Sequence, residues 1–353
     1  MRMDAYLLVT IDTESDNLWA GKKDLSFDNL KEIPRLHHFL ERHEVRPTYL
    51  VSYPVATSQI GREVLQPIAR SDRAELGSHM HVWTTPPLKP VTSYDHSYCP
   101  LATEITEVLL KEKMKNLTNA VGELSGSQPQ AHRAGRYALD SRVLLVLETL
   151  GYAVDTSVTP LLNWRERAHD GTWRGPDFTR APLNPYYPDR HDVTQSGSSP
   201  VLEVPVSYFV TRPLPRRLAL LLTRLPRDNN LVRALRRTGL IRHAWLRPGR
   251  QVNGHVLIGV ARALIMAGVR VLNVMFHSSE MAVGTSPHTR THHDVEDSYR
   301  QLDTLLTYLR RHTNTQPVTL SELATKYRQS LCRHNPIRAH SQRLSSTNCS
   351  PPR

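Results

Sequence analysis

The chain has 353 residues, of which 39% are hydrophobic and 22% are charged, and these fractions exclude a disordered or membrane-embedded protein. Its length fits an α/β barrel with insertions. The net charge of +12 is concentrated in residues 212–250, with eleven Arg and one Asp, and in residues 327–353, with five Arg and no acid. Because the remainder is slightly acidic, the charge argues against a general nucleic-acid-binding protein.

Apolar runs and helical periodicity alternate along the chain. The runs predict strands at 5–11, 45–53, 74–83, 130–137, 152–158, 201–208 and 270–277. The periodicity predicts helices at 27–43, 58–70, 103–124, 140–150, 253–268 and 294–311, the last three beginning at Asp140, Asn253 and Asp294. Repeated strand–helix units predict an α/β fold with a parallel sheet, and about seven strands favour a distorted (β/α) barrel.

The chain divides into one predicted domain and a predicted tail. Residues 1–326 form the predicted domain, with insertions at 159–200 and 212–250. Residues 327–353 lack apolar periodicity, and we expect a disordered tail there. The short N-terminal apolar run contains acidic residues, which argues against a signal sequence. No stretch approaches the roughly 18 apolar residues of a membrane span, so we expect a cytoplasmic protein.

Polar side chains stand where the predicted strands end, which is where parallel α/β folds place active sites. They are two carboxylates, three imidazoles and a guanidinium: Asp12 and Glu14, His79 and His81, His277, and Arg133. Residues two apart on an extended backbone point the same way, so each D-x-E or H-x-H pair faces one side. Either pair alone would be ordinary solvated residues, but both together favour a zinc-like metal site.

Four motifs in this order, VTIDTE, ELGSHMHVW, HRAGRY and VMFHSSE, resemble those of the polysaccharide deacetylase family, the NodB-homology group of carbohydrate esterase family four. The resemblance covers roughly residues 5–310 and indicates a divergent branch. It implies a metal-dependent hydrolase that removes an N-acyl group, most often N-acetyl, from an amino sugar of a polysaccharide or lipid-linked glycan precursor. It also implies a NodB-homology barrel, with a divalent ion, expected to be zinc, as cofactor.

The resemblance also implies a role for each motif residue. Asp12 corresponds to the general base, and Arg133 to the arginine that orients it. Glu14 and His79 correspond to metal ligands, and His277 to the general acid.

Two positions depart from the family pattern. The second motif usually has another histidine four residues after the first, where this chain has Trp83, and the third motif usually has proline at Gly135. Either His81 completes the metal site, or the ligand set differs, or metal binding is weakened. We place Trp83, Tyr137, Tyr186 and Tyr187 among the substrate-binding residues, and a backbone N–H near Tyr137 would hold the oxyanion.

Other segments allow two interpretations each. Residues 278–288 are a lid or an ordinary loop. Tyr186 and Tyr187 stack against a sugar or pack an insertion onto the core. The nearby histidines are expected to cap a helix or lie on the surface: His288, His292 and His293.

The basic segment 212–250 is either a solvated helical hairpin or a peripheral membrane surface for acidic lipids or a lipid-linked glycan. Arginines beside the active-site rim would favour an anionic, lipid-linked substrate: Arg216, Arg217, Arg236 and Arg237. Only Trp245 accompanies them, so RNA binding is not expected. The alternatives to a sugar deacetylase are a hydrolase of a small amide, as in allantoinase-like relatives, and an inactive barrel that binds a glycan or a partner.

Overall fold

The computed structural model describes residues 4–18, 25–88, 100–167, 173–211, 242–250 and 252–334. A curved parallel sheet has the strand order β11-β1-β2-β3-β4-β5-β8, and β12 also pairs with β1. Its strands are β1 Asp4–Thr13, β2 Thr48–Ser52, β3 Glu75–Met80, β4 Ala131–Ala134, β5 Val154–Asp155, β8 Leu202–Glu203, β11 Val271–His277 and β12 Asn314–Pro317. All seven predicted strands are confirmed, whereas β12 was not predicted.

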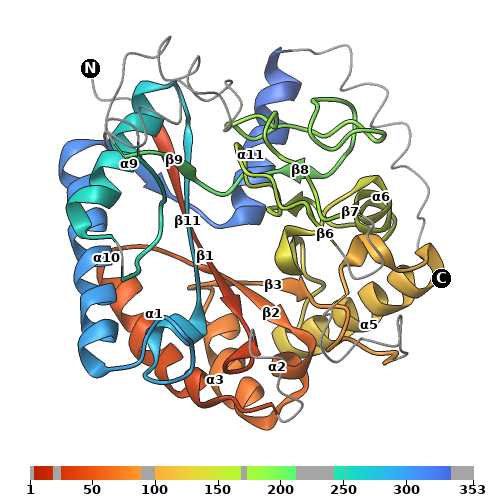
Figure 1. Ribbon diagram of the computed structural model, residues 1–353, viewed down its shortest axis with the longest axis horizontal. Helices are drawn as coiled ribbons and strands as arrows, with labels where there is room; N and C mark the ends of the chain where they lie inside the picture. The colour runs from red at the N-terminus through yellow and green to blue at the C-terminus, as the bar shows by residue number, and fades with distance from the viewer. Residues whose placement is uncertain are drawn as a thin grey trace, which may run out of the picture.

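Helices surround the outer face of this sheet (Figure 1). They are η2 Asp28–Glu32, α1 Ile33–Arg42, α2 Tyr53–Thr57, α3 Gln59–Arg70, η3 Ala102–Glu104, α5 Glu107–Ser125, α6 Ser141–Thr149, α9 Gly254–Met266 and α10 His292–His312. The last helix, α11 Leu320–His334, packs instead at one end of the barrel. The predicted caps Asp140 and Asn253 accept hydrogen bonds from the first turns of α6 and α9. The predicted start of the last helix at Asp294 is wrong. Thr291 caps α10, and the Asp294 carboxylate accepts a hydrogen bond from the Thr291 N–H in return.

Strand side chains alternate between two apolar clusters, because successive residues of a strand point to opposite faces. On β1, Leu7, Val9 and Ile11 join the large core between sheet and helices. Leu8 belongs instead to a separate cluster inside the curve of the sheet, which we call the barrel interior. Leu50, Ala131, Val154, Leu202 and Val271 supply the rest of its strand layer.

The two edge strands of the sheet approach each other without forming a ladder. The segment after β8 contacts β11: the Ser207 N–H donates to the Asn273 carbonyl at 3.3 Å, and the Asn273 N–H donates to Ser207 Oγ at 2.9 Å. The Asn273 side chain also donates to the Pro205 carbonyl at 3.4 Å. The sheet is therefore a distorted barrel, as the sequence predicted.

The C-terminal segment closes the end of the barrel from which the strands start. The Val318 N–H donates to the Leu7 carbonyl at 3.0 Å, and Leu320, Leu323 and Ala324 of α11 pack into the barrel interior. In Figure 1 this helix lies at the end of the sheet where β1 begins. The predicted tail boundary at residue 327 is corrected, because α11 continues to His334; residues 335–353 lie outside the described residues.

The insertion at 159–200 is ordered over its described residues and carries a small hairpin, β6 Glu166–Arg167 with β7 Trp173–Arg174. Phe178, fully buried, anchors it to the core. Of the basic insertion, residues 242–250 are described and include β10 His243–Trp245, which pairs with β9 Tyr208–Val210. The four arginines expected beside the rim lie outside the described residues. No helix in the described ranges combines the length and apolarity that a bilayer span requires.

Candidate active site

A cleft of about 600 Å³ opens at the carboxyl ends of the strands. The predicted residues Asp12, Glu14, His79, His81 and His277 line it. Parallel pairing brings them together, because the register places Asp12 beside His277 and His79 beside Arg133. We call Asp12, Glu14, His79, His81 and Arg133 the cleft floor.

Three floor residues present a donor set that fits a divalent metal ion. The Nε2 atoms of His79 and His81 lie 2.6 and 2.7 Å from the same Glu14 oxygen, Oε1. All three side chains are buried, and their donor atoms lie within 4.8 Å of one another. One carboxylate oxygen and two imidazole nitrogens form a ligand set that zinc accepts in catalytic sites.

Buried hydrogen bonds hold the Glu14 segment in place. The Asn29 side chain donates to the Glu14 carbonyl at 2.9 Å and accepts from Ser278 Oγ at 2.7 Å. It therefore joins the loop after β1 to the loop after β11. Burial alone would raise the pKa of Glu14, but the adjacent imidazoles outweigh it and hold that pKa well below its usual range.

The two ligand histidines are held in different ways. His79 Nδ1 lies 2.9 Å from the Arg133 carbonyl oxygen, which orients its Nε2 toward Glu14. His81 Nδ1 is buried and has no hydrogen-bond partner among the described residues. Its ring packs instead against Trp83, with ring centroids 4.5 Å apart. Burial lowers the pKa of His81, which keeps the imidazole neutral, as a metal ligand must be.

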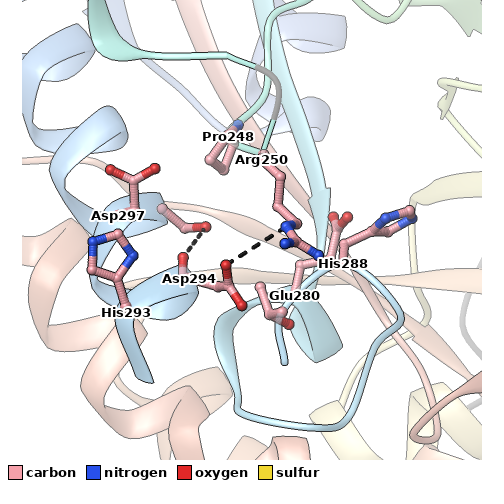
Figure 2. A pocket seen from close by; sticks show the side chains of 10 residues that line it. Pro248, Arg250, Glu280, His288, His293, Asp294 and Asp297 are labelled. Carbon is pink, nitrogen blue, oxygen red and sulfur yellow. Dashed lines mark hydrogen bonds and ion pairs between the residues drawn. The ribbon is translucent and has the colours of Figure 1, made fainter. Parts of the chain in front are cut away.

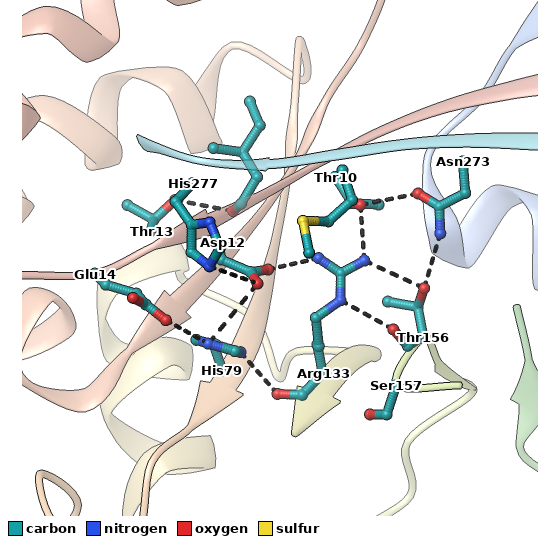
Figure 3. A network of polar contacts seen from close by, with 12 residues as sticks. Thr10, Asp12, Thr13, Glu14, His79, Arg133, Thr156, Ser157, Asn273 and His277 are labelled. Carbon is teal, nitrogen blue, oxygen red and sulfur yellow. Dashed lines mark hydrogen bonds and ion pairs between the residues drawn. The ribbon is translucent and has the colours of Figure 1, made fainter. Parts of the chain in front are cut away.

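Asp12 is paired with a fully buried arginine. Arg133 Nη1 donates to Asp12 Oδ1 at 2.5 Å, and Nη2 donates to Thr10 Oγ1 at 2.8 Å. Its Nε donates to the Thr156 carbonyl at 2.9 Å. The Asn273 side chain hydrogen-bonds to both threonine hydroxyls: it accepts from Thr10 Oγ1 and donates to Thr156 Oγ1, each at 2.9 Å (Figure 3). Because every contact is buried, the guanidinium fixes the Asp12 carboxylate in one orientation.

His277 stands on the other side of Asp12, with its Nε2 3.7 Å from Asp12 Oδ2. Its Nδ1 lies 3.3 Å from Glu280 Oε2, and Arg247 Nη2 contacts the other Glu280 oxygen at 2.5 Å. Burial alone would lower the pKa of His277, but the hydrogen bond and charge of Glu280 raise it. Glu280 and Arg247 were not predicted, although Glu280 ends the motif VMFHSSE.

The turn after β4 is strained where it faces the cleft. Arg136 and Tyr137 have φ angles of 55° and 58°, consecutive left-handed residues that are not glycine. Such strain is typical of functional sites. The turn places the Tyr137 ring in the cleft, stacked against Trp164 at 5.1 Å and Trp245 at 5.9 Å between centroids. We call these three residues the aromatic wall.

The charged residues beside this wall are paired with one another. Glu166 accepts from Arg136 at 2.8 Å and from Arg174 at 2.5 Å. Arg174 also contacts Glu104 at 3.5 Å. The wall therefore combines aromatic faces with paired charges, a combination suited to a polar substrate that carries no large net charge.

Two predicted substrate residues lie elsewhere. Tyr186 is 7% exposed, pairs with Glu203 in a β-bridge and donates to the Val193 carbonyl at 2.6 Å. Tyr187 packs against the barrel interior, as does Tyr327 of α11 at the opposite end of the barrel from the cleft. Their prediction as stacking residues is wrong, because both pack the insertion onto the body. Trp83 and Tyr137 do line the cleft.

The loop after His277 is packed rather than free to open. Within it, Thr285 Oγ1 donates to the Ser279 carbonyl at 2.7 Å, and Ser286 Oγ lies 2.8 Å from Thr289 Oγ1. His288, expected to cap a helix or lie on the surface, lines the cleft instead. The ordinary-loop interpretation of residues 278–288 fits these contacts.

A smaller cavity of about 150 Å³ lies behind Glu280, and His288 lines both cavities. Figure 2 shows its acidic residues, Glu280, Asp294 and Asp297. Each has a partner: Arg247 for Glu280, Thr291 for Asp294, and Gln301, at 2.7 Å, for Asp297. Their hydrogen bonds are thus directed to protein groups rather than to a shared cation.

Comparisons with solved structures agree with this fold. A candidate polysaccharide deacetylase from Mycobacterium smegmatis is similar over 93% of this chain and 92% of its own, with 15% identity and a TM-score of 0.51. A candidate glycoside hydrolase/deacetylase from Parabacteroides distasonis is similar over 93% and 72%, with 12% identity and a TM-score of 0.53. No protein-family profile matches the sequence, and no characterised protein sequence matches it. The chain therefore has the NodB-homology deacetylase fold that its motifs predicted.

Proposed function

We propose that the chain is a metal-dependent hydrolase that removes an N-acyl group, most often N-acetyl, from an amino sugar. One observation carries the proposal: an O,N,N donor set lies beside two groups placed for proton transfer. Glu14, His79 and His81 supply the donors, and Asp12 and His277 stand 3.7 Å apart next to them. A barrel that only bound a glycan would have no need for this buried, mutually oriented set.

Each floor residue has a distinct task in this reaction. When bound to Glu14, His79 and His81, the divalent ion supplies Lewis acidity toward the acyl carbonyl and the attacking water. Asp12 accepts the proton of that water through Oδ2, because Arg133 already occupies Oδ1. The Tyr137 backbone N–H, on the strained turn, is our candidate donor to the developing oxyanion.

His277 donates the proton that the leaving amine needs. Glu280 contacts its Nδ1, so its Nε2 faces Asp12 and the cleft. The raised pKa of His277 keeps a larger share of the imidazole protonated near neutral pH. Asp12 and His277 therefore act as separate base and acid on one scissile bond, each oriented by its own charged partner.

The aromatic wall indicates a saccharide substrate. Tyr137, Trp164 and Trp245 present apolar ring surface beside paired charges, which suits the alternating apolar faces and hydroxyl edges of a sugar. We propose a polysaccharide or oligosaccharide as the substrate. A lipid-linked saccharide with peripheral membrane contact stays a prediction, since its arginines lie outside the described residues.

The first test is the metal content of the purified protein after equilibration with Zn²⁺. We expect about one equivalent in wild type and much less in Glu14→Ala and His79→Ala. His38→Ala, at an exposed histidine of α1, is the matched control and should keep the ion. Wild-type protein that binds no ion after reconstitution would contradict the proposal and favour an inactive, binding barrel.

The second test is release of acetate from N-acetylated chitooligosaccharides, compared with hydrolysis of allantoin. We expect acetate release by the metal-loaded wild type and none by Glu14→Ala. Hydrolysis of allantoin alone would replace the sugar with a small amide as substrate while leaving the metal chemistry intact.

A further inference from the structure

Gly135 is placed where a side chain would meet a metal-ligand candidate. A Cβ atom built on Gly135 would lie 2.3 Å from His81 Nδ1 and 2.6 Å from His81 Cε1. It would also lie 2.7 Å from the carbonyl oxygen of Met80, the last residue of β3 and the one before His81. Carbon atoms pack at about 3.5–4.0 Å, so any side chain at this position would displace the His81 ring by about 1 Å.

Backbone conformation does not explain this glycine. Its φ angle lies outside the left-handed range, unlike those of Arg136 and Tyr137, which follow it. The position is buried at the start of η4 Gly135–Tyr137. The close approaches of the His81 ring and of the Met80 carbonyl oxygen are therefore the physical reason for glycine here.

His81 also depends on packing more than its neighbour does. The Arg133 carbonyl orients His79, whereas His81 Nδ1 has no hydrogen-bond partner among the described residues. Apart from its Nε2 contact with Glu14 at 2.7 Å, the His81 ring is held by packing: it contacts Trp83 and lies directly against Gly135. At the Nδ1 edge, which faces Gly135, no hydrogen bond among the described residues opposes a displacement of the ring.

We propose that Gly135 is a positioning residue that allows His81 to serve as the third metal ligand. The inference rests on the proposed metal site. It also gives one explanation for the two positions at which this sequence departs from the family pattern, Trp83 and Gly135. With histidine at position 81 and Trp83 at the usual ligand position, the ring occupies the space that a side chain at position 135 would fill. Ligand distances tolerate only about 0.2 Å, so a displacement of about 1 Å would remove His81 from the ligand set.

The test is a double-mutant cycle read as Zn²⁺ affinity by calorimetry. We expect Gly135→Ala to weaken binding about 10–100-fold, similar to the loss in His81→Ala. In the double variant Gly135→Ala/His81→Ala, the glycine change should cost little further affinity, because the ring it displaces is gone. Gly122→Ala in α5 is the control: its nearest contact would be 3.7 Å away, and it should bind like wild type.

The outcomes separate this inference from the proposed function. Wild-type protein that binds no metal would overturn the metal site itself. If wild type binds and Gly135→Ala binds equally well, the positioning role of Gly135 is wrong. If the two losses in the double variant multiply, Gly135 acts independently of His81 and the inference also fails. Circular dichroism of each variant checks that it is folded, and affinity of the folded fraction is compared.

Discussion

The cleft floor and the aromatic wall are held by different forces. In the floor, Arg133 and His79 make buried hydrogen bonds to partners on β1, on β4 and directly after β5. In the wall, Tyr137, Trp164 and Trp245 contact one another mainly through their rings and come from a strained turn, an insertion and a short hairpin. The buried polar contacts of the floor therefore fix its chemistry, whereas the Trp164 and Trp245 rings of the wall can change position without changing the reaction.

Asp12→Asn should have the largest effect, because it removes the proposed base while keeping its shape. We expect kcat to fall about 10²–10⁴-fold, with bound Zn²⁺ retained, since the ligand set is Glu14, His79 and His81. Acetate release and metal content measure the two effects. Asp28→Asn, at an exposed carboxylate, should change neither, and an Asp12→Asn enzyme with normal kcat would remove Asp12 from the mechanism.

Arg133→Met tests whether the floor is held as one buried network. It leaves the Asp12 carboxylate buried without its charge partner, and it leaves Thr10 and the Thr156 carbonyl without their donor. We expect the free energy of unfolding to fall by about 3–5 kcal/mol, measured by urea denaturation. Arg62→Met, on the exposed side of α3, should change it by about 0.5 kcal/mol or less. Equal losses in the two variants would contradict a specific role for Arg133.

Glu280→Gln should shift the pH dependence of kcat/KM without changing the cleft floor. His277 must be protonated to donate, so activity falls as pH rises through its pKa, and Glu280 raises that pKa. Removing the negative charge lowers that pKa, so the alkaline limb of kcat/KM should shift to lower pH. Glu296→Gln, at an exposed residue of α10, is the control. An unchanged alkaline limb would mean that His277 is not the acid.

Substitutions in the wall should have the smallest effects. For Trp164→Ala and Trp245→Ala we expect KM to rise about two- to twelvefold with kcat nearly unchanged, because a stacking contact is worth about 0.5–1.5 kcal/mol. The increase should be larger on an oligosaccharide than on a monosaccharide. Trp173→Ala in the same insertion is the control, because that ring is 66% exposed and does not line the cleft. A large fall in kcat instead would place the wall in the chemistry.

The difference between floor and wall also explains what could be predicted from sequence. Parallel strands end at one edge of a sheet, so Asp12, His79 and His277 could be brought together without knowing any loop. The aromatic wall could not be predicted in this way, because Trp164 and Trp245 come from two insertions whose paths the sequence does not indicate. For Tyr186 and Tyr187, residue type suggested stacking, whereas burial and direction decided their place.

In α5, the spacing of apolar residues likewise failed to predict which side chains are buried. Helical spacing within residues 103–124 predicts that Val108 lies on the apolar face, but it is 79% exposed, whereas Lys113 is 1% exposed. The lysine is buried because its ammonium group donates to three carbonyls, those of Val82, Thr85 and Pro87, in the loop after His81. No pattern of apolar residues could indicate a buried cation with three acceptors. The positioning residues Glu280 and Asn29 were missed for the same reason.

The closing of the barrel by α11 has a practical meaning for anyone who engineers this chain. A version shortened before Val318 would expose Leu8, Leu50 and Leu202 to water at the end of the barrel opposite the cleft. A fusion partner attached after α11, in contrast, would stand on the side of the molecule away from the substrate. The last helix is thus both the part of the chain that cannot be trimmed and the natural place for an attachment.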